Sequence, residues 1–152
     1  MRTINRHIIH TSYTRPSQDI GADEIRQWHT SPDPNDPSKP WRDIGYHYVI
    51  RRDGTIEKGR LDAVMGAHVG QHNFDSIGTC LIGGMKETDR VPEFNYTKEQ
   101  LLALFKHIED METLYPGVKT SGHNDWDTGR SCPVFNVKEL LKNQAKNSDS
   151  NT

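Results

Sequence analysis

A histidine and a cysteine, His123 and Cys132, lie in one turn-rich segment near the end of the chain, residues 122–135. Imidazole nitrogen and thiolate sulfur are two of the ligand types by which zinc is held in proteins. Arg130 places a cation just before the cysteine, which favours the thiolate form. Because two ligands do not complete a metal site, we expect another part of the chain to supply a third.

His10 is the candidate for that third ligand. It lies at the end of a short apolar run, residues 7–11, that predicts a buried strand. Three protein ligands, with the fourth position left to water, are typical of catalytic zinc, which lowers the pKa of its water to about 7. Spacing alone leaves the question open, because a histidine at a strand end is more often a packed or surface residue.

Further residues could take part in chemistry, and each also has a plain structural interpretation. Tyr46 lies in a strand-like stretch, where tyrosine more often packs than reacts, and His68 follows a glycine-containing turn. A proline-rich loop, residues 31–40, could rim a cleft. Trp41 directly follows this loop and is either a surface anchor or a platform for a sugar ring. Asp125 or Asp127 could act as a fourth ligand and make the zinc purely structural.

The elements that position these residues can be predicted from periodicity and turn chemistry. Strands are expected at 7–11, 44–51, 55–58 and 76–82, with Asp53-Gly54 as a hairpin turn. Helices are expected at 22–30, at 97–114, where Thr97 and Gln100 form a capping box, and at 137–141. The order predicts an α/β fold: a single domain with a central mixed β-sheet flanked by helices. We expect the catalytic domain at 1–142 and a disordered polar tail at 143–152.

Composition limits the classes of function. A chain of 152 residues suits one domain, and a net charge of −2 with a pI near 6.4 argues against a general nucleic-acid-binding protein. The apolar runs are too short to span a bilayer and the N-terminus lacks a signal-peptide pattern, so we expect synthesis in the cytoplasm. Cys80 and Cys132 are expected as free thiols, with a bridge between them as the minor alternative.

Taken together, the motifs resemble a known family. They occur in the order Ile-Ile-His10-Thr-Ser, Ile-Gly-Tyr46-His-Tyr-Val-Ile, Arg-Asp-Gly-Thr-Ile-Glu-Lys-Gly-Arg, Gly-Ala-His68, Asn73-Phe-Asp-Ser-Ile-Gly and His123…Arg130-Ser-Cys132-Pro. Over residues 4–140 the chain resembles phage lysozymes of the N-acetylmuramoyl-L-alanine amidase family, relatives of the peptidoglycan recognition proteins. The ordered set is specific, because chance would have to place every piece.

The resemblance implies an amidase-like fold and an endolysin that cleaves the amide bond between N-acetylmuramic acid and L-alanine in peptidoglycan. The zinc ligands that it implies for one Zn²⁺ ion are His10, His123 and Cys132. It implies Tyr46 and Arg130 as catalytic residues that stabilise the oxyanion, and His68 as a substrate-binding residue. Arg130 stands where related phage enzymes carry lysine; arginine keeps the cation but does not donate a proton near neutral pH.

The resemblance also implies partners and a place of action. Peptidoglycan is the expected partner of a monomer that binds no nucleic acid and does not insert into membranes. The protein is expected to leave the host cytoplasm through a holin-type membrane lesion. Two alternatives remain: a non-catalytic peptidoglycan-binding module, and an additional role as inhibitor of a phage RNA polymerase. Cys132 argues against the first, because binding-only members commonly lack it, and the few residues before the first strand give the second little support.

Overall fold

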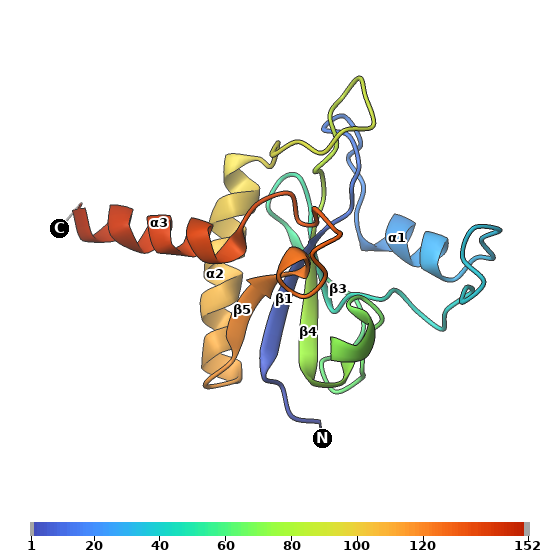
Figure 1. The fold of residues 1–152 in the computed structure, drawn as a ribbon, viewed down its shortest axis with the longest axis horizontal. Helices are drawn as coiled ribbons and strands as arrows, with labels where there is room; N and C mark the ends of the chain where they lie inside the picture. Colours follow the sequence, from blue (N-terminus) through green and yellow to red (C-terminus); the bar gives the residue numbers. More distant parts are fainter. Residues whose placement is uncertain (1, 151–152) are drawn as a thin grey trace.

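The computed structural model of the chain describes residues 2–150 and forms one mixed sheet of five strands in the order β3-β2-β4-β1-β5 (Figure 1). The strands are β1 (Arg6–Thr11), β2 (Tyr48–Ile50), β3 (Ile56–Lys58), β4 (Ser76–Leu81) and β5 (Lys119–Gly122). β1 pairs in parallel with both β4 and β5, and β2 pairs in parallel with β4 and antiparallel with β3. The predicted α/β domain with a mixed sheet is therefore confirmed.

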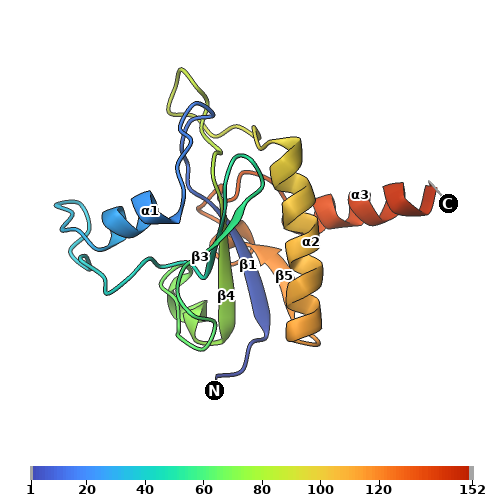
Figure 2. The same cartoon turned by 180° about the vertical axis from the view of Figure 1, so that it is seen from behind.

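The two faces of the sheet are covered by different helices. α2 (Lys98–Leu114) and α1 (Ala22–His29) lie on opposite sides of the sheet in both Figure 1 and Figure 2. Side chains alternate along a strand, so neighbouring positions face opposite helices. On β4, Leu81 joins the buried cluster of α2, whereas Cys80 joins the buried cluster of α1. His10, which lies opposite Cys80 in the β1–β4 register, therefore belongs to the face that α2 does not cover.

The start of α2 follows the chemistry that the sequence predicts. The Thr97 hydroxyl accepts a 3.0 Å hydrogen bond from the Gln100 amide, and the Gln100 side chain accepts one of 2.9 Å from the Thr97 amide. This confirms the capping box. Gln100 is fully buried, and its side-chain nitrogen also donates to the carbonyl of Ile82 at 2.8 Å. The same side chain thus caps the helix and ties it to the end of β4.

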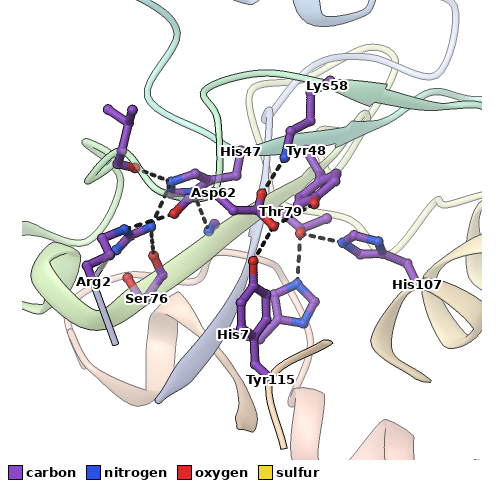
Figure 3. A network of polar contacts seen from close by, with 12 residues as sticks. Arg2, His7, His47, Tyr48, Lys58, Asp62, Ser76, Thr79, His107 and Tyr115 are labelled. Atoms are coloured by element: carbon purple, nitrogen blue, oxygen red, sulfur yellow. Dashed lines mark hydrogen bonds and ion pairs between the residues drawn. The ribbon is translucent and has the colours of Figure 1, made fainter. Parts of the chain in front are cut away.

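The α2 face also contains buried polar groups (Figure 3). Thr79 lies between two histidines, with its hydroxyl oxygen 2.8 Å from His7 Nε2 and 2.9 Å from His107 Nε2. A hydroxyl can donate to one ring and accept from the other, so both contacts are satisfied. Burial lowers the pKa of His7 well below its usual value and that of His107 to about 4. The pair is therefore held neutral at pH 7, away from the predicted site.

Among the strands and α-helices, three differ from the prediction by more than one residue at an end. β2 begins at Tyr48 instead of residue 44, because the preceding backbone bonds to loops: Ala67 N donates to the Gly45 carbonyl at 3.0 Å, and Arg60 N donates to that of Tyr46 at 2.9 Å. β5 was not predicted, since its sequence Lys-Thr-Ser-Gly has no apolar alternation.

α3 (Val137–Ser150) continues past residue 141, where the sequence predicts a disordered tail. Residues 151–152 of that tail lie outside the described residues, and the domain boundary at 142 stays a prediction.

Within residues 2–150, no helix has both the length and the apolar character needed to cross a membrane.

Candidate metal centre

The sheet brings the two predicted histidine ligands to the same edge. β1 and β5 are parallel neighbours with Ile9 opposite Gly122. The residue that follows each of these two is a candidate ligand. His10 follows Ile9 on β1, and His123 follows Gly122 at the start of a 3₁₀ turn (His123–Asp125). The carboxyl ends of parallel strands meet at one edge, where α/β proteins commonly place their sites. The two imidazole centroids are 4.8 Å apart.

Cys132 reaches this edge from the segment that follows. Its Sγ lies 3.7 Å from His10 Nδ1 and accepts a 3.1 Å hydrogen bond from the backbone N–H of Thr11. The segment is anchored on both sides of the cysteine. Asn124 N donates to the Cys132 carbonyl at 2.8 Å, and the Tyr96 hydroxyl donates to the carbonyl of the following proline at 2.6 Å. The thiol is thus held against β1 by backbone and side-chain contacts.

The three donors converge on one point. In the part of the chain that the structure describes, the group that could hold a metal ion consists of His10, His123 and Cys132, whose ligand atoms lie within 4.8 Å of one another. Neither aspartate of the segment joins the group. Asp125 accepts a 2.8 Å hydrogen bond from the Gly122 amide, and Asp127 pairs with Arg130 at 3.1 Å. The geometry therefore gives no support to a closed structural site with four protein ligands.

The protonation of the three groups suits a metal ion. Burial lowers the pKa of His10 well below its usual value and also lowers that of His123, so both rings are neutral near pH 7, as metal ligands must be. Burial raises the pKa of Cys132 to about 11, although the Thr11 amide and then Arg130 act in the opposite direction. Without an ion the thiol is therefore protonated near pH 7 despite Arg130, and a cation bound at the sulfur would favour the thiolate. The donor set fits zinc.

Tyr46 lies beside the metal-ligand group. Its ring centroid is 5.1 Å from that of His10. Burial raises the pKa of the Tyr46 hydroxyl well above its usual value, with Cys80 and Cys132 as smaller contributions, so this group stays protonated and can donate a hydrogen bond. The two cysteines near Tyr46, Cys80 and Cys132, are free thiols, which confirms that prediction.

These side chains line a cleft of about 710 Å³. Its walls include residues from the strand ends, from the proline-rich loop and from the segment around Cys132, namely His10, Tyr13, His29, Asp36, Trp41, Tyr46, His68, Asn73, Pro92, His123, Arg130 and Cys132. Trp41 packs against His29 with the two rings tilted by 56° and their centroids 4.7 Å apart, and its indole N–H donates to Ser38 at 3.0 Å. The loop thus forms part of the rim, as expected. Arg130 is largely exposed at the cleft, where its Nε bonds to Asp127.

The side chain of His68 makes contacts that the sequence does not predict. His68 lines the cleft, but its Nδ1 lies 2.8 Å from His10 Nε2 and its Nε2 lies 3.2 Å from the Ser76 hydroxyl. Both ring nitrogens therefore face protein partners. Sequence reasoning missed Ser76. A usable signal was the run of small residues at alternate positions of β4, Ser76, Gly78 and Cys80, because such a run leaves room for an imidazole over one face of the strand.

The sequence profile of the N-acetylmuramoyl-L-alanine amidase family matches residues 1–135. The chain belongs to the N-acetylmuramoyl-L-alanine amidase family. This amidase is similar to the endolysin of Klebsiella phage KP32, with 38% identity over 142 residues that cover 93% of this chain and 88% of the relative. The endolysin of Escherichia phage T7 is 36% identical over 142 residues, with the same coverage of 93% and 88%. The family that the sequence motifs resemble is thus confirmed, and with it peptidoglycan hydrolysis.

Solved structures share the fold of this amidase. The endolysin LysCS of Clostridium intestinale, an N-acetylmuramoyl-L-alanine amidase, superposes with a TM-score of 0.76 at 23% identity, covering 95% of this chain and 85% of the other. Drosophila PGRP-LB superposes with a TM-score of 0.67 at 27% identity, covering 88% and 76%. The predicted amidase and peptidoglycan-recognition-protein fold is therefore confirmed.

Proposed function

We propose that this amidase cleaves the bond between N-acetylmuramic acid and L-alanine with one zinc ion held by His10, His123 and Cys132. The observation that carries the proposal is the convergence of two neutral imidazoles and one thiol at the strand ends inside the cleft. Family membership supports the substrate bond. The similarity to phage endolysins supports peptidoglycan as the substrate, reached after release of the protein from the cell that makes it.

When bound, zinc polarises a carbonyl group and supplies hydroxide near neutral pH. The protein's own groups must then stabilise the negative charge that develops on the carbonyl oxygen of the scissile amide. Tyr46 suits this role, because its ring lies beside that of His10 in the cleft and its hydroxyl remains protonated. A donor that is already in place stabilises such a charge without reorganising at the moment of reaction.

Arg130 is the second candidate for stabilising this charge. Its side chain lines the same cleft as His10, His123 and Cys132. Burial, and then the positive charge of Arg130, lower the pKa of His123, which supports a place for this charge near the ligand group. In the structure its Nε is bonded to Asp127, so contact with the substrate would use the remaining N–H groups or a rotation of the side chain. Because arginine stays protonated, its role is charge stabilisation and not proton transfer.

A non-catalytic peptidoglycan-binding module is the competing function, and zinc content together with wall hydrolysis separates the two. The test uses purified cell walls, the protein with stoichiometric zinc, the same protein stripped with a chelator, and the stripped protein reloaded with zinc. The proposal predicts release of soluble wall peptide by the zinc-loaded protein and by the reloaded protein, and not by the stripped protein. Equal release by the stripped protein, or binding to walls without release by the zinc-loaded protein, would contradict it.

A further inference from the structure

We propose that His68 and Ser76 form a hydrogen-bonded pair that fixes the orientation and tautomer of His10 and leaves His10 Nδ1 free for the metal. The inference rests on the proposed zinc site. It gives His68 a positioning role instead of the substrate contact that the sequence resemblance implies. It also gives a role to Ser76, a fully buried residue at the start of β4.

The two nitrogens of His10 face different partners. Nδ1 faces the Cys132 sulfur at 3.7 Å, and Nε2 faces His68 Nδ1 at 2.8 Å. A neutral imidazole carries one proton, and the nitrogen that binds a metal must be the one without it. If His10 binds through Nδ1, the nitrogen that points to the other ligands, its proton is on Nε2. That proton is then donated to His68 Nδ1.

The tautomer of His68 in turn sets the direction of its hydrogen bond to Ser76. When His68 accepts at Nδ1, its own proton is on Nε2, which lies 3.2 Å from the Ser76 hydroxyl oxygen and donates to it. In the opposite arrangement Ser76 donates to His68, His68 donates to His10, and the proton of His10 moves to Nδ1. That arrangement would block the ligand atom. The direction of two hydrogen bonds therefore decides whether His10 can bind the metal.

The position of the His68 ring is strictly limited by its neighbours. A Cβ atom added at Gly78 would lie 2.6 Å from His68 Cγ, and one added at Gly66 would lie 2.8 Å from its Cδ2. The ring thus lies between two glycines, and a side chain at either position would collide with it. Its backbone is held as well, because the Asn73 side chain accepts hydrogen bonds from the amides of His68, at 3.0 Å, and Val69, at 2.8 Å. Such support is what a partner of a metal ligand requires.

The tautomer of the neighbouring His47 is fixed in a different way from that of His68. Its Nδ1 accepts a 3.0 Å hydrogen bond from the Gly78 amide, so its proton is on Nε2 and is donated to the Val64 carbonyl at 2.8 Å. The backbone fixes this tautomer. The His47 ring packs edge-on against that of His68, with a centroid distance of 5.8 Å, but the hydrogen bonds that set its tautomer go to the backbone and not to His68 or His10. Arg2 lies beside it and donates to the Ser76 carbonyl at 2.8 Å, which anchors the serine backbone (Figure 3).

The test measures the zinc affinity of variants by competition with a chelator. Loss of an outer-shell partner typically costs about 10–100-fold in metal affinity, so we expect a loss in this range for His68→Ala. Ser76→Ala should give a smaller loss in the same direction. His68→Asn should recover much of the affinity, because an amide oxygen can replace Nδ1 as the acceptor for His10. His72→Asn is the matched control and should keep the parent affinity, since His72 contacts Arg6 and Trp126.

A second readout does not depend on affinity. Nitrogen-15 NMR of histidine rings in the zinc-loaded parent should find the proton on Nε2 in both His10 and His68. A proton on His68 Nδ1 would overturn the inference, as would a His68→Ala variant within twofold of the parent affinity. If His68→Ala does not fold in the presence of chelator, the comparison of Ser76→Ala with the parent decides. The failure of the zinc site itself looks different, because the parent would then take up no zinc or Cys132→Ser would bind it equally well.

Discussion

The backbone N–H of Thr11 donates a 3.1 Å hydrogen bond to the sulfur of Cys132. Thr11 directly follows His10 on β1, so one strand end presents a candidate ligand and also holds a second ligand in position. A hydrogen bond to sulfur favours its charged form, in the same direction as a bound cation. The thiol of Cys132 is therefore positioned by the fold of β1.

The clearest test of the ligand set is Cys132→Ser. The hydroxyl of serine is a much weaker zinc ligand than a thiolate, so zinc affinity should fall by more than the roughly 10–100-fold typical of an outer-shell change. Zinc content after dialysis and chelator competition measure this. Cys80→Ala is the matched control: it removes the other thiol, which packs in the α1 cluster, and should leave zinc bound. Equal zinc content in Cys132→Ser and the parent would contradict the assignment.

Tyr46→Phe tests the hydroxyl without removing the ring. The ring keeps its packing beside His10, so zinc should stay bound and the fold should persist. Turnover on purified peptidoglycan should fall on the order of 10²–10³-fold, which is typical for loss of one oxyanion donor. Steady-state kinetics with zinc-loaded protein measure it. Turnover at the parent rate would show that Tyr46 does not act in the reaction.

Arg130 can be tested by comparing two substitutions. Arg130→Ala removes the cation at the cleft and should lower turnover about 10²-fold, at the low end of the range for a lost donor because the side chain is largely exposed. Arg130→Lys keeps a cation and should retain much more activity than Arg130→Ala. Lys106→Ala, on the exposed side of α2, controls for loss of a positive charge and should have no effect. Equal turnover of Arg130→Ala and Arg130→Lys would show that the charge at this position is not used.

The buried histidines of the α2 face predict a loss of stability in acid. The folded-state pKa of His107 lies at about 4, and that of His7 is also lowered, because burial outweighs the opposing effect of Asp110 and Asp62 on His107. The unfolded chain therefore binds more protons below about pH 6.5, so stability is fully present above this value and falls as the pH drops towards 4. Each such histidine contributes a slope of up to about 1.4 kcal/mol per pH unit.

Urea unfolding between pH 7 and pH 5, in excess chelator, measures this slope. His107→Gln is the matched variant, since its amide can still bond to Thr79 but does not titrate. The free energy of unfolding of His107→Gln should depend less steeply on pH than that of the parent. Identical slopes would show that His107 is not held neutral in the folded protein.

The metal site could be predicted only in part from the sequence. The apolar run of β1 marks a strand and places His10 at its end, but spacing does not show what lies beside it. His10 and His123 meet because β5, a polar edge strand, pairs in parallel with β1. Side-chain periodicity carries no signal for such a strand. The ligand set therefore depended on the resemblance to a family, and the geometry now supports it independently.

The direction of the His68 ring was beyond sequence reasoning for a different reason. A Gly-Ala-His turn predicts a loop, but the ring orientation depends on the space above Gly78, a residue on a separate strand. Only tertiary packing shows that His68 points to His10. The length of α3 is a similar case: its polar second half lacks an apolar face, yet the helix that begins at Val137 continues to Ser150.

Mass spectrometry of digested peptidoglycan identifies the bond that the enzyme cleaves. Purified wall material is treated with the zinc-loaded protein, and the soluble products are separated and sequenced. We expect free stem peptides with an N-terminal L-alanine and intact glycan strands. Shortened glycan strands, or peptides cut between amino acids with the lactyl–alanine bond intact, would contradict it.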